Sequence, residues 1–468
     1  MVAGARTLVR RLAGADLRKL TRWTTNSVVS ASNRLRWHGA RLRMQVYEAL
    51  APRGTLPPGS LAASSSRDAH LDDKFYLKQF QRHGRIFKLF WGSGHLKICL
   101  VGFDYARGLL QQHHARLHPV TIDLTPLVPN EYLRSMRPEI HPQYRGAFSK
   151  GLRKDLVTEL EPEFRQFVRD ELDGLAALQE PASLARGLHE VLDHVCIKIL
   201  VRFVLGVRPD SGWFPSLCRT YRRLGPGDYV APIGPEQKAA YPIIRDLVGK
   251  IVQAHREDGN QGVGDSLIGR MIHAPDSSVD ETVIGNAIYM VERGRHDLRD
   301  LLWWCTRHLS DHPAVVTELR EADAARGTNS RLAEACVLET LRLEQAEVLV
   351  RKALAPLTLD GYRIPKGSWV CILMRESHRD ANVFPDPDAY RPQRFLDRVY
   401  SANEYAPFGL DEHHCIGRAL VVTIGTLFVQ ELVAGYEWSI AGDGPRVFGP
   451  LHWQPSPSFA IDLRPRVR

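Results

Sequence analysis

Residues 408–420 read FGLDEHHCIGRAL and place a single cysteine, Cys415, immediately before a strongly helical run. A sulfur at this point lies near unpaired backbone N–H groups and the positive end of the helix dipole, and both favour a thiolate over a thiol. A thiolate is the ligand that a soft metal centre requires, and Gly409 and Gly417 allow the backbone to approach a flat cofactor closely. Most single cysteines are small core residues, so the assignment depends on the residues around Cys415.

The loop resembles the proximal loop of the cytochrome P450 family of haem-thiolate enzymes, which has the form F-G-x-G-x-H/R-x-C-x-G. The positions that match are Phe408, Gly409, His413, Cys415 and Gly417. Asp411 stands where the family usually has its second glycine, and because Asp tolerates a left-handed backbone we expect the loop to form with some strain there. The resemblance implies haem b (iron protoporphyrin IX), with Cys415 as its axial ligand and the other four matching residues around it.

Two further segments resemble the family in the right order. Glu339-Thr340-Leu341-Arg342 resembles its E-x-x-R motif, and on a helix this spacing puts the carboxylate and the guanidinium on one face. Pro392-Gln393-Arg394-Phe395 resembles the segment whose arginine, here Arg394, completes a buried triad with that pair. The motif alone would favour a solvent-facing ion pair; together with Arg394 and the cysteine loop it favours the buried triad.

Three basic residues match positions that usually reach the haem propionates in this family. They are Arg351 in LVRKAL, and His141 and Arg145 in HPQYR. Two carboxylates buried against protein need cationic or hydrogen-bonding partners, which these side chains supply. The alternative for His141 and Arg145 is a place on the surface.

The distal helix departs from the family pattern. The family carries A-G-x-D/E-T there, whose acid and alcohol relay protons during oxygen activation, whereas residues 293–297 read RGRHD. Gly294 is kept, and Arg293, His296 and Asp297 stand at the alanine, acid and threonine positions. The usual acid–alcohol pair is therefore absent.

Two interpretations of these charges remain open. Arg293 and Asp297, at i and i+4, would make an ordinary surface pair if the helix over 280–308 were partly exposed. We favour the second interpretation, in which the charges face the pocket, because apolar residues flank them at helical spacing. These residues are Ile284, Ile288, Val291, Leu298, Leu301 and Leu302.

In the pocket, the charged residues would change the chemistry. His296 and Asp297 would form a substitute proton relay, and Arg293 or Arg295 would hold a substrate carboxylate or stabilise peroxide. A monooxygenase with a different proton relay, a peroxide-using or substrate-assisted variant, and a non-oxidative haem-thiolate enzyme all fit this pattern. The distal pocket is expected to draw on residues 117–137, 207–240 and 284–298.

The composition excludes several classes of protein. A chain of 468 residues that is 44% apolar and 25% charged can bury a large core and is neither disordered nor fibrous. Its seven cysteines are scattered without a C-x-x-C pair, which excludes a zinc ribbon and a disulfide framework and favours a reducing compartment. We find no run of roughly 18 consecutive apolar residues that would predict a membrane-spanning helix.

The net charge of +9 belongs to the N-terminal segment. Residues 1–53 hold ten arginines and Lys19 against only Asp16 and Glu48, so the rest of the chain is balanced. No basic surface with a nucleic-acid motif is evident in that remainder, and we expect no nucleic-acid partner. The segment itself is interpreted as a solvated extension, a membrane-surface helix or a targeting peptide.

We predict a basic N-terminal extension over residues 1–56 and a single catalytic domain over 57–468, with the cytochrome P450 fold, mainly α with small β-sheets. The stretch from Leu56 to Ser60, which contains two prolines and a glycine, separates them. Helices should dominate residues 150–345, interrupted by the Pro/Gly-rich stretch 207–237. Short strands are expected at 86–92, 96–102, 349–354 and 368–374.

The resemblance implies a haem-thiolate oxidoreductase that oxidises a small organic substrate, in bacterial secondary metabolism, with NAD(P)H-derived electrons from a ferredoxin-like or flavoprotein donor. Arginine outnumbers lysine 50 to 12, a bias of GC-rich bacterial genomes, so we expect a bacterial cytoplasmic enzyme whose only membrane contact is through the basic N-terminus. A haem protein that binds a ligand or a partner enzyme without catalysis is the alternative from another class. Turnover with reductant or peroxide separates the two.

Overall fold

The computed structural model describes most of the chain from residue 55 to residue 466. The gaps are 62–68, 70, 91–94, 121–131, 153, 179–180, 225–234, 258–262, 275–278, 327–329, 345–347 and 449–452. Before residue 55 it describes only 38–39, 41–42, 44–46 and 49. The predicted N-terminal extension therefore lies almost entirely outside the described residues.

The chain forms two compact units that alternate along the sequence. The smaller comprises the described residues up to Leu100, His113–His118 and Arg351–Cys371, and the larger comprises the described residues of Val101–Gln112, Pro119–Val350 and Ile372–Arg468. The smaller unit thus draws on both early and late segments of the chain, as the positions of the predicted strands indicate.

A six-stranded sheet, most of which belongs to the smaller unit, joins early and late strands. Its order is β1 (Gly59–Ser60), β2 (Ile86–Phe90), β3 (Leu96–Leu100), β8 (Trp369–Leu373), β5 (Val348–Ala353) and β4 (Leu117–Pro119). Strand β1 runs parallel to β2, and β2 runs antiparallel to β3. Every residue of β2 and β3 is buried, in keeping with their apolar sequences IFKLF and LKICL. The unit also holds α4 (Phe75–His83), η1 (His114–Arg116) and the antiparallel pair β6 (Leu357–Leu359) and β7 (Tyr362–Ile364).

The larger unit is helical. Its elements are α5 (Phe103–His113), η2 (Leu133–Ser135), α6 (His141–Gly151), α7 (Lys154–Ala176), α8 (Pro181–Leu205), α9 (Trp213–Leu224), α10 (Pro235–Arg256), α11 (Leu267–His273), α12 (Glu281–Asp311), α13 (Pro313–Arg326), α14 (Ser330–Glu344), α15 (Met374–Ser377), α16 (Arg394–Asp397) and α17 (Arg418–Gly435). Two antiparallel strand pairs accompany them, β9 (Tyr436–Gly442) with β12 (Ala460–Pro465) and β10 (Val447–Phe448) with β11 (Trp453–Gln454).

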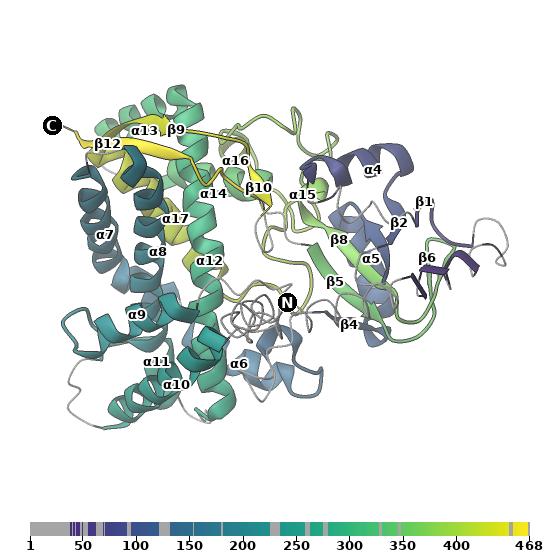
Figure 1. The fold of residues 1–468 in the computed structure, drawn as a ribbon, viewed down its shortest axis with the longest axis horizontal. Coiled ribbons are helices and arrows are strands. Elements are labelled where there is room, and N and C mark those ends of the chain that lie inside the picture. The colour runs from purple at the N-terminus through teal and green to yellow at the C-terminus, as the bar shows by residue number, and fades with distance from the viewer. Residues whose placement is uncertain are drawn as a thin grey trace, which may run out of the picture. The chain divides into compact units, whose positions relative to one another are not determined.

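The long helix α12 organises this unit. The carboxylate of Asp280 accepts a hydrogen bond from the Val283 N–H at 2.9 Å and caps the start of α12. The helix ends at Asp311, just before Pro313, which cannot continue it. Between these ends α12 packs against α8, α14 and α17, and Figure 1 shows α8 running beside α12, with α7 on the other side of α8.

The stretch 207–237, predicted as a break in the helical pattern, contains the helix α9. Its prolines and glycines flank α9 or lie in its first turn, where Pro215 is tolerated because the first N–H groups of a helix lack partners anyway. Phe214, Leu217 and Tyr221 recur at helical spacing and are buried. The sequence analysis missed this helix of three turns because the helix-breaking prolines and glycines around it obscured the helical periodicity.

Helix α17 is the one helix among the described residues that is long and apolar enough to cross a membrane. In the structure 56% of that segment is buried, and α17 packs against α14 and α7 in the core. Its apolar sequence is therefore accounted for by burial against other helices. The fold class predicted from the sequence, mainly α with small β-sheets, is confirmed.

Candidate functional site

The cysteine loop turns tightly into α17. Gly409 has a φ of +105°, and a Cβ there would lie 3.1 Å from the Cα of His414, so both the conformation and the space require glycine. The backbone N–H of Cys415 donates to the carbonyl of Phe408 at 2.7 Å and closes the loop. Cys415 is exposed, and Gly417 caps the start of α17 just after it. The sulfur thus lies at the N-terminal end of a long helix, as predicted.

Asp411 does not carry the backbone strain that we predicted. Among the described residues only Asp360 and Asp386 are non-glycine residues with positive φ. The carboxylate of Asp411 instead accepts a hydrogen bond from the His413 N–H at 3.0 Å, and its carbonyl accepts one from the His414 N–H at 3.0 Å. An Asp can therefore replace the family's glycine because its side chain builds an Asx turn in ordinary backbone space.

A cavity of about 220 Å³ in the larger unit joins the cysteine loop to α12. All five residues of the loop that match the family pattern line it. Apolar side chains form most of the remaining wall; they include Leu200, Phe203, Leu298, Leu301, Leu420 and Ile424. The site is thus an apolar chamber with an accessible sulfur on one side.

One face of α12 points into this cavity. Met290, Arg293, Gly294, Asp297 and Leu298 recur at intervals of three and four residues and line it. The guanidinium of Arg293 pairs with the carboxylate of Asp297 at 3.0 Å. The Arg293 side chain is 11% exposed and that of Asp297 is 43% exposed. This geometry fits the second interpretation, in which the charged residues face the pocket. Arg293 and Asp297 do form an i, i+4 ion pair, but they form it within the pocket.

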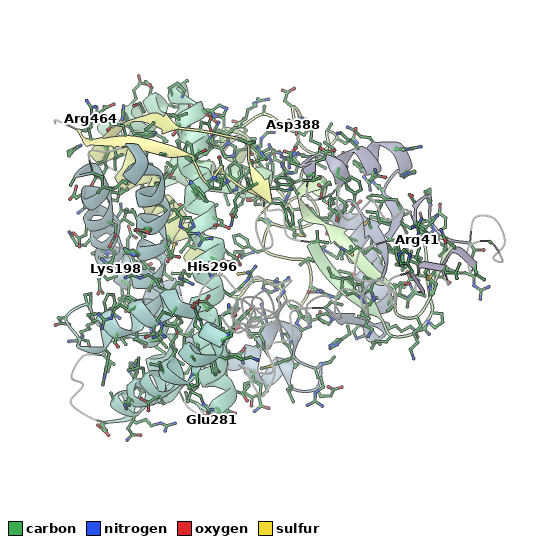
Figure 2. All side chains as sticks on the ribbon, in the orientation of Figure 1. Arg41, Lys198, Glu281, His296, Asp388 and Arg464 are labelled. Carbon is green, nitrogen blue, oxygen red and sulfur yellow. The ribbon has the colours of Figure 1, made fainter. Side chains whose placement is uncertain are left out.

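His296 lies near the middle of α12 (Figure 2) but is not among the residues that line the cavity. Its Nε2 is 3.0 Å from an oxygen of Glu292, and its Nδ1 is 3.2 Å from Nη1 of Arg299. Nε2 also lies 3.1 Å from Nη2 of Arg295, so both ring nitrogens are engaged by residues of α12 that do not line the cavity. The structure therefore does not bring His296 together with Asp297 as the predicted relay requires.

The surroundings of His296 form a buried ion cluster between α8 and α12. Arg295 pairs with Asp193 at 3.1 Å and with Glu292 at 3.1 Å, while Arg299 pairs with Asp300 at 2.7 Å. Arg295 is consequently engaged away from the cavity and does not hold a ligand there. Of the two arginines predicted to bind a substrate carboxylate, only Arg293 lines the chamber.

Basic residues gather at the edge of the cysteine loop. Arg145 donates to the carbonyl of His414 at 3.0 Å, and both Arg145 and His413 line the cavity. The rings of His141 and His413 lie 4.2 Å apart. Within the described part of the chain no hydrogen bond reaches the buried Nε2 of His141, and burial together with Arg145 lowers its pKa. A buried ring nitrogen that requires a hydrogen-bond partner fits the carboxylates of the haem expected from the resemblance. Gly409 and Gly417 leave room for the flat face of that haem. Arg351, the third predicted partner, is a buried residue of β5 in the smaller unit.

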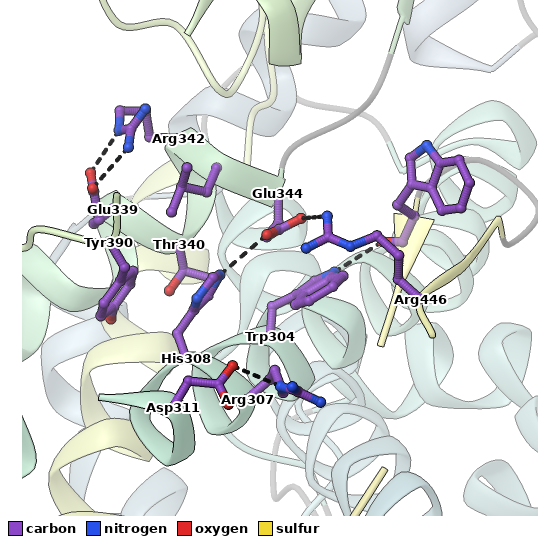
Figure 3. Close-up of polar contacts among 12 residues, drawn as sticks. Trp304, Arg307, His308, Asp311, Glu339, Thr340, Arg342, Glu344, Tyr390 and Arg446 are labelled. Carbon is purple, nitrogen blue, oxygen red and sulfur yellow. Dashed lines mark hydrogen bonds and ion pairs between the residues drawn. The ribbon is translucent and has the colours of Figure 1, made fainter. Parts of the chain in front are cut away.

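The predicted triad is assembled in the larger unit. Arg342 binds Glu339 through two parallel hydrogen bonds of 2.7 and 2.9 Å (Figure 3), and Arg394 reaches the same carboxylate at 3.0 Å. Glu339 and Arg342 are completely buried. Phe384 lies against both guanidinium groups, at 5.1 and 6.0 Å from its ring centroid.

The range 117–137, which was expected to reach the pocket, contributes Tyr132, Leu133 and Arg134 to the cavity wall, although the sequence analysis singled out none of these three residues. None of the described residues in the range 207–240 lines the cavity, and Phe214 packs on Phe167 instead. Tyr229, in the same range, lies outside the described residues. A one-dimensional pattern offers no signal that distinguishes these two loops.

Comparisons with known proteins identify the relatives of the chain. A family model described as Cytochrome P450 matches residues 302–457. The chain is 29% identical over 240 residues to an Arabidopsis thaliana abscisic acid 8'-hydroxylase 2, covering 46% of this chain and 48% of that protein. It is 27% identical over 327 residues to a Streptomyces fradiae 20-oxo-5-O-mycaminosyltylactone 23-monooxygenase, covering 68% and 71%. The matched part thus spans about half the length of the first of these relatives.

A solved structure shows the same fold. A cyanobacterial CYP120A1 bound to retinoic acid superposes with a TM-score of 0.71 at 18% identity, over 88% of this chain and 99% of that one.

Proposed function

The chain belongs to the cytochrome P450 family, and on that premise we propose that it is a haem-thiolate monooxygenase acting on a small, mostly apolar organic acid. The observation that carries the proposal is that Cys415 and the Arg293–Asp297 pair line one apolar cavity. Residues 57–468 are proposed as the catalytic domain and residues 1–56 as a separate basic extension.

Haem b, when bound, supplies the redox chemistry, which an axial thiolate tunes by electron release. Cys415 would hold it, with Phe408, Gly409, His413 and Gly417 around it. His141 and Arg145 would hold its carboxylates, because Arg145 is bonded to the His414 carbonyl of the cysteine loop and the ring of His141 lies 4.2 Å from that of His413. NAD(P)H-derived electrons would reach it from a ferredoxin-like or flavoprotein donor.

Asp297 is proposed to hold the proton that the family's acid–alcohol pair otherwise handles. It is the carboxyl group on the cavity face of α12, and its partner Arg293 fixes its position. Gly294 keeps the helix close to α8, since a Cβ there would come within 3.3 Å of Leu200. His296 contributes through the ion cluster that it joins and not through the cavity.

Arg293 is proposed to bind the carboxylate of the substrate. A guanidinium has five N–H donors, so it can serve Asp297 and a second carboxylate together. The abscisic acid named for one similar protein is a carboxylic acid with a largely hydrocarbon skeleton, which supports this class of substrate. The Streptomyces relative and the arginine-rich composition support a role in bacterial secondary metabolism and a cytoplasmic location.

The first test is the spectrum of the ferrous, CO-bound protein. Wild-type protein should show the strongly red-shifted Soret band of thiolate-ligated haem, and Cys415→Ser should abolish it because the ligand is lost. A wild-type spectrum typical of histidine ligation would overturn the proposed function.

The second test separates the two cavity charges. Asp297→Asn should keep haem and substrate binding but reduce reductant-driven turnover, because it keeps the shape and removes a titratable proton. Arg293→Gln should weaken binding of an acid by about tenfold or more while leaving its neutral amide nearly unaffected. Equal losses for acid and amide would contradict the carboxylate contact, and unchanged turnover in Asp297→Asn would contradict the proton role.

A second candidate function is favoured by the missing acid–alcohol pair. A peroxide-dependent enzyme would turn over with hydrogen peroxide and need no electron donor, and a non-oxidative enzyme would convert substrate with neither. A haem protein without catalytic activity would bind the acid and convert it under none of these conditions.

A further inference from the structure

Asn286 is an unexpected residue in the buried part of α12. It lies between the apolar residues Ile284 and Ile288, and its side chain is completely buried. Asparagine is a weak helix former, and burying its amide costs free energy unless both ends are hydrogen-bonded. A polar residue that breaks the local pattern in this way requires a structural or functional reason.

Both ends of the Asn286 amide are engaged. Its Oδ1 accepts the backbone N–H of Leu133 at 2.7 Å, and its Nδ2 donates to the carbonyl of Thr282 at 2.8 Å. The second bond fixes the orientation of the first, because a reversed amide would set N–H against N–H and oxygen against oxygen. Leu133 begins the short turn η2, and the preceding residue, Tyr132, offers no capping side chain. Helix α12 thus supplies an acceptor that the local chain lacks.

The anchored segment forms part of the cavity wall. Tyr132, Leu133 and Arg134 all line the chamber, whereas Asn286 does not. The ring of Tyr132 lies 3.8 Å from that of Tyr289, three residues further along α12. The wall therefore contacts α12 through a buried hydrogen bond and a ring contact, and Met136, two residues after Arg134, is also buried.

A second link ties the following helix to the same part of α12. The hydroxyl of Tyr144, on α6, donates to the carboxylate of Asp280 at 2.7 Å. The chain from 132 to 144 is held at both ends, so loosening the Leu133 contact would free the wall without releasing α6.

We propose that Asn286 is a positioning residue that holds Tyr132–Arg134 as a wall of the ligand cavity and thereby governs how fast bulky ligands enter and leave. The part of the proposal that concerns ligands rests on the proposed function, whereas the anchor itself does not.

Hydrogen exchange tests the anchor directly. In the holoprotein, Asn286→Leu should raise the exchange rate of backbone amides in a peptide spanning 133–137 by about tenfold, because one buried hydrogen bond is lost. Asn286→Ala, which favours helix, should act in the same direction. The matched control is Thr306→Val, which removes another buried side-chain hydrogen bond of α12, to the carbonyl of Leu302 at 2.9 Å, and should leave this peptide unchanged.

Ligand kinetics test the consequence. Stopped-flow binding of 4-phenylimidazole to the ferric protein should show association and dissociation rates that both rise by about tenfold in Asn286→Leu and Asn286→Ala, since the wall opens more often. Carbon monoxide, which is far smaller, should recombine with the ferrous variants within about twofold of the wild-type rate. A merely destabilised fold would instead change exchange throughout α12.

The failures are distinguishable. Unchanged exchange at 133–137, or unchanged 4-phenylimidazole rates in variants with the normal CO-bound Soret band, would overturn the proposal and leave the proposed function intact. A wild-type protein without the thiolate Soret band would overturn the proposed function, and exchange at 133–137 would still decide the anchor.

Discussion

Glu339 binds two guanidinium groups at a point closed to water. Arg342 uses all five of its N–H donors, two on Glu339 and three on the carbonyls of His378, Pro387 and Ala389. The carboxylate also accepts the backbone N–H of Arg391 at 2.8 Å. Such a network gives a strong preference for one local structure, because any single removal leaves buried charge without a partner.

Glu339→Gln should therefore lower the free energy of unfolding by about 3–5 kcal/mol, the usual cost of breaking a buried ion pair. Chemical denaturation of the holoprotein measures it. The control is Arg391→Ala: its side chain pairs with Asp386 at the surface, with both side chains at least half exposed, so the loss should stay below about 1 kcal/mol. Similar small effects in both variants would show that the triad contributes little to stability.

Glu344 makes stability depend on acid pH. Burial alone would raise its pKa, but the hydrogen bond with His308 and the charges of Arg375 and Arg446 outweigh burial and lower the pKa to about 2 (Figure 3). A carboxyl group whose pKa is depressed in the folded state stabilises the protein above its unfolded pKa, and the stabilisation disappears as pH falls through both values.

The unfolding free energy of wild-type protein should therefore fall between about pH 5 and pH 2, with Glu344 contributing about 3 kcal/mol as an order of magnitude. Glu344→Gln should lose that part of the pH dependence. Glu437→Gln serves as the control because Glu437 is 56% exposed. Identical pH profiles for wild type and Glu344→Gln, measured by denaturation, would show that Glu344 does not carry this pH dependence.

At the scale of the element, α12 divides its charges between two faces. Arg293 and Asp297 lie on the cavity face, and Glu292, Arg295 and His296 lie in the buried cluster toward α8. A difference of one residue in the sequence thus separates a group that meets ligands from one that holds two helices together.

His296→Gln should consequently have little effect on catalysis. The side-chain amide of glutamine can donate to Glu292, whose carboxylate lies 3.0 Å from Nε2 of the ring, and can also accept from a neighbouring guanidinium. Turnover should stay within about threefold of wild type, and its pH profile should not shift, because the side chain handles no substrate proton. Steady-state turnover rates from about pH 5.5 to 8.5 provide the measurement. A loss of turnover as large as that of Asp297→Asn would show that His296 takes part in the proton relay.

What the sequence predicts at this scale depends on distance along the chain. The pairing of Glu339 with Arg342 and the turn around Gly409 follow from spacings of a few residues, which one helix or loop fixes. The contact of Asn286 with Leu133 joins residues 153 positions apart, so no local sequence pattern predicts it. The side of α12 on which His296 falls depends on where α8 packs, which is also a tertiary fact.

At the scale of the whole molecule, charge is distributed very unevenly along the chain. The excess of nine positive charges belongs to residues 1–53, and the remaining residues are balanced. Long-range attraction to an anionic surface depends on such net charge and is screened by salt. The basic segment is therefore the part of the chain whose removal should change surface binding.

Deleting residues 1–53 should abolish binding to vesicles that contain phosphatidylserine, if the full chain binds them, and should leave haem content unchanged. Each Lys or Arg near an anionic membrane contributes about 1 kcal/mol, so eleven basic residues are ample for reversible binding. The truncation point spares Thr55, whose carbonyl accepts the Arg363 N–H at 2.7 Å, and β1, which pairs with β2. Two controls test whether the binding is electrostatic. The full chain should not bind neutral phosphatidylcholine vesicles, and about 0.5 M salt should prevent its binding to phosphatidylserine vesicles. Haem loss on truncation would mean instead that the extension stabilises the folded domain, and binding that persists without it would place the membrane contact on the balanced remainder of the chain.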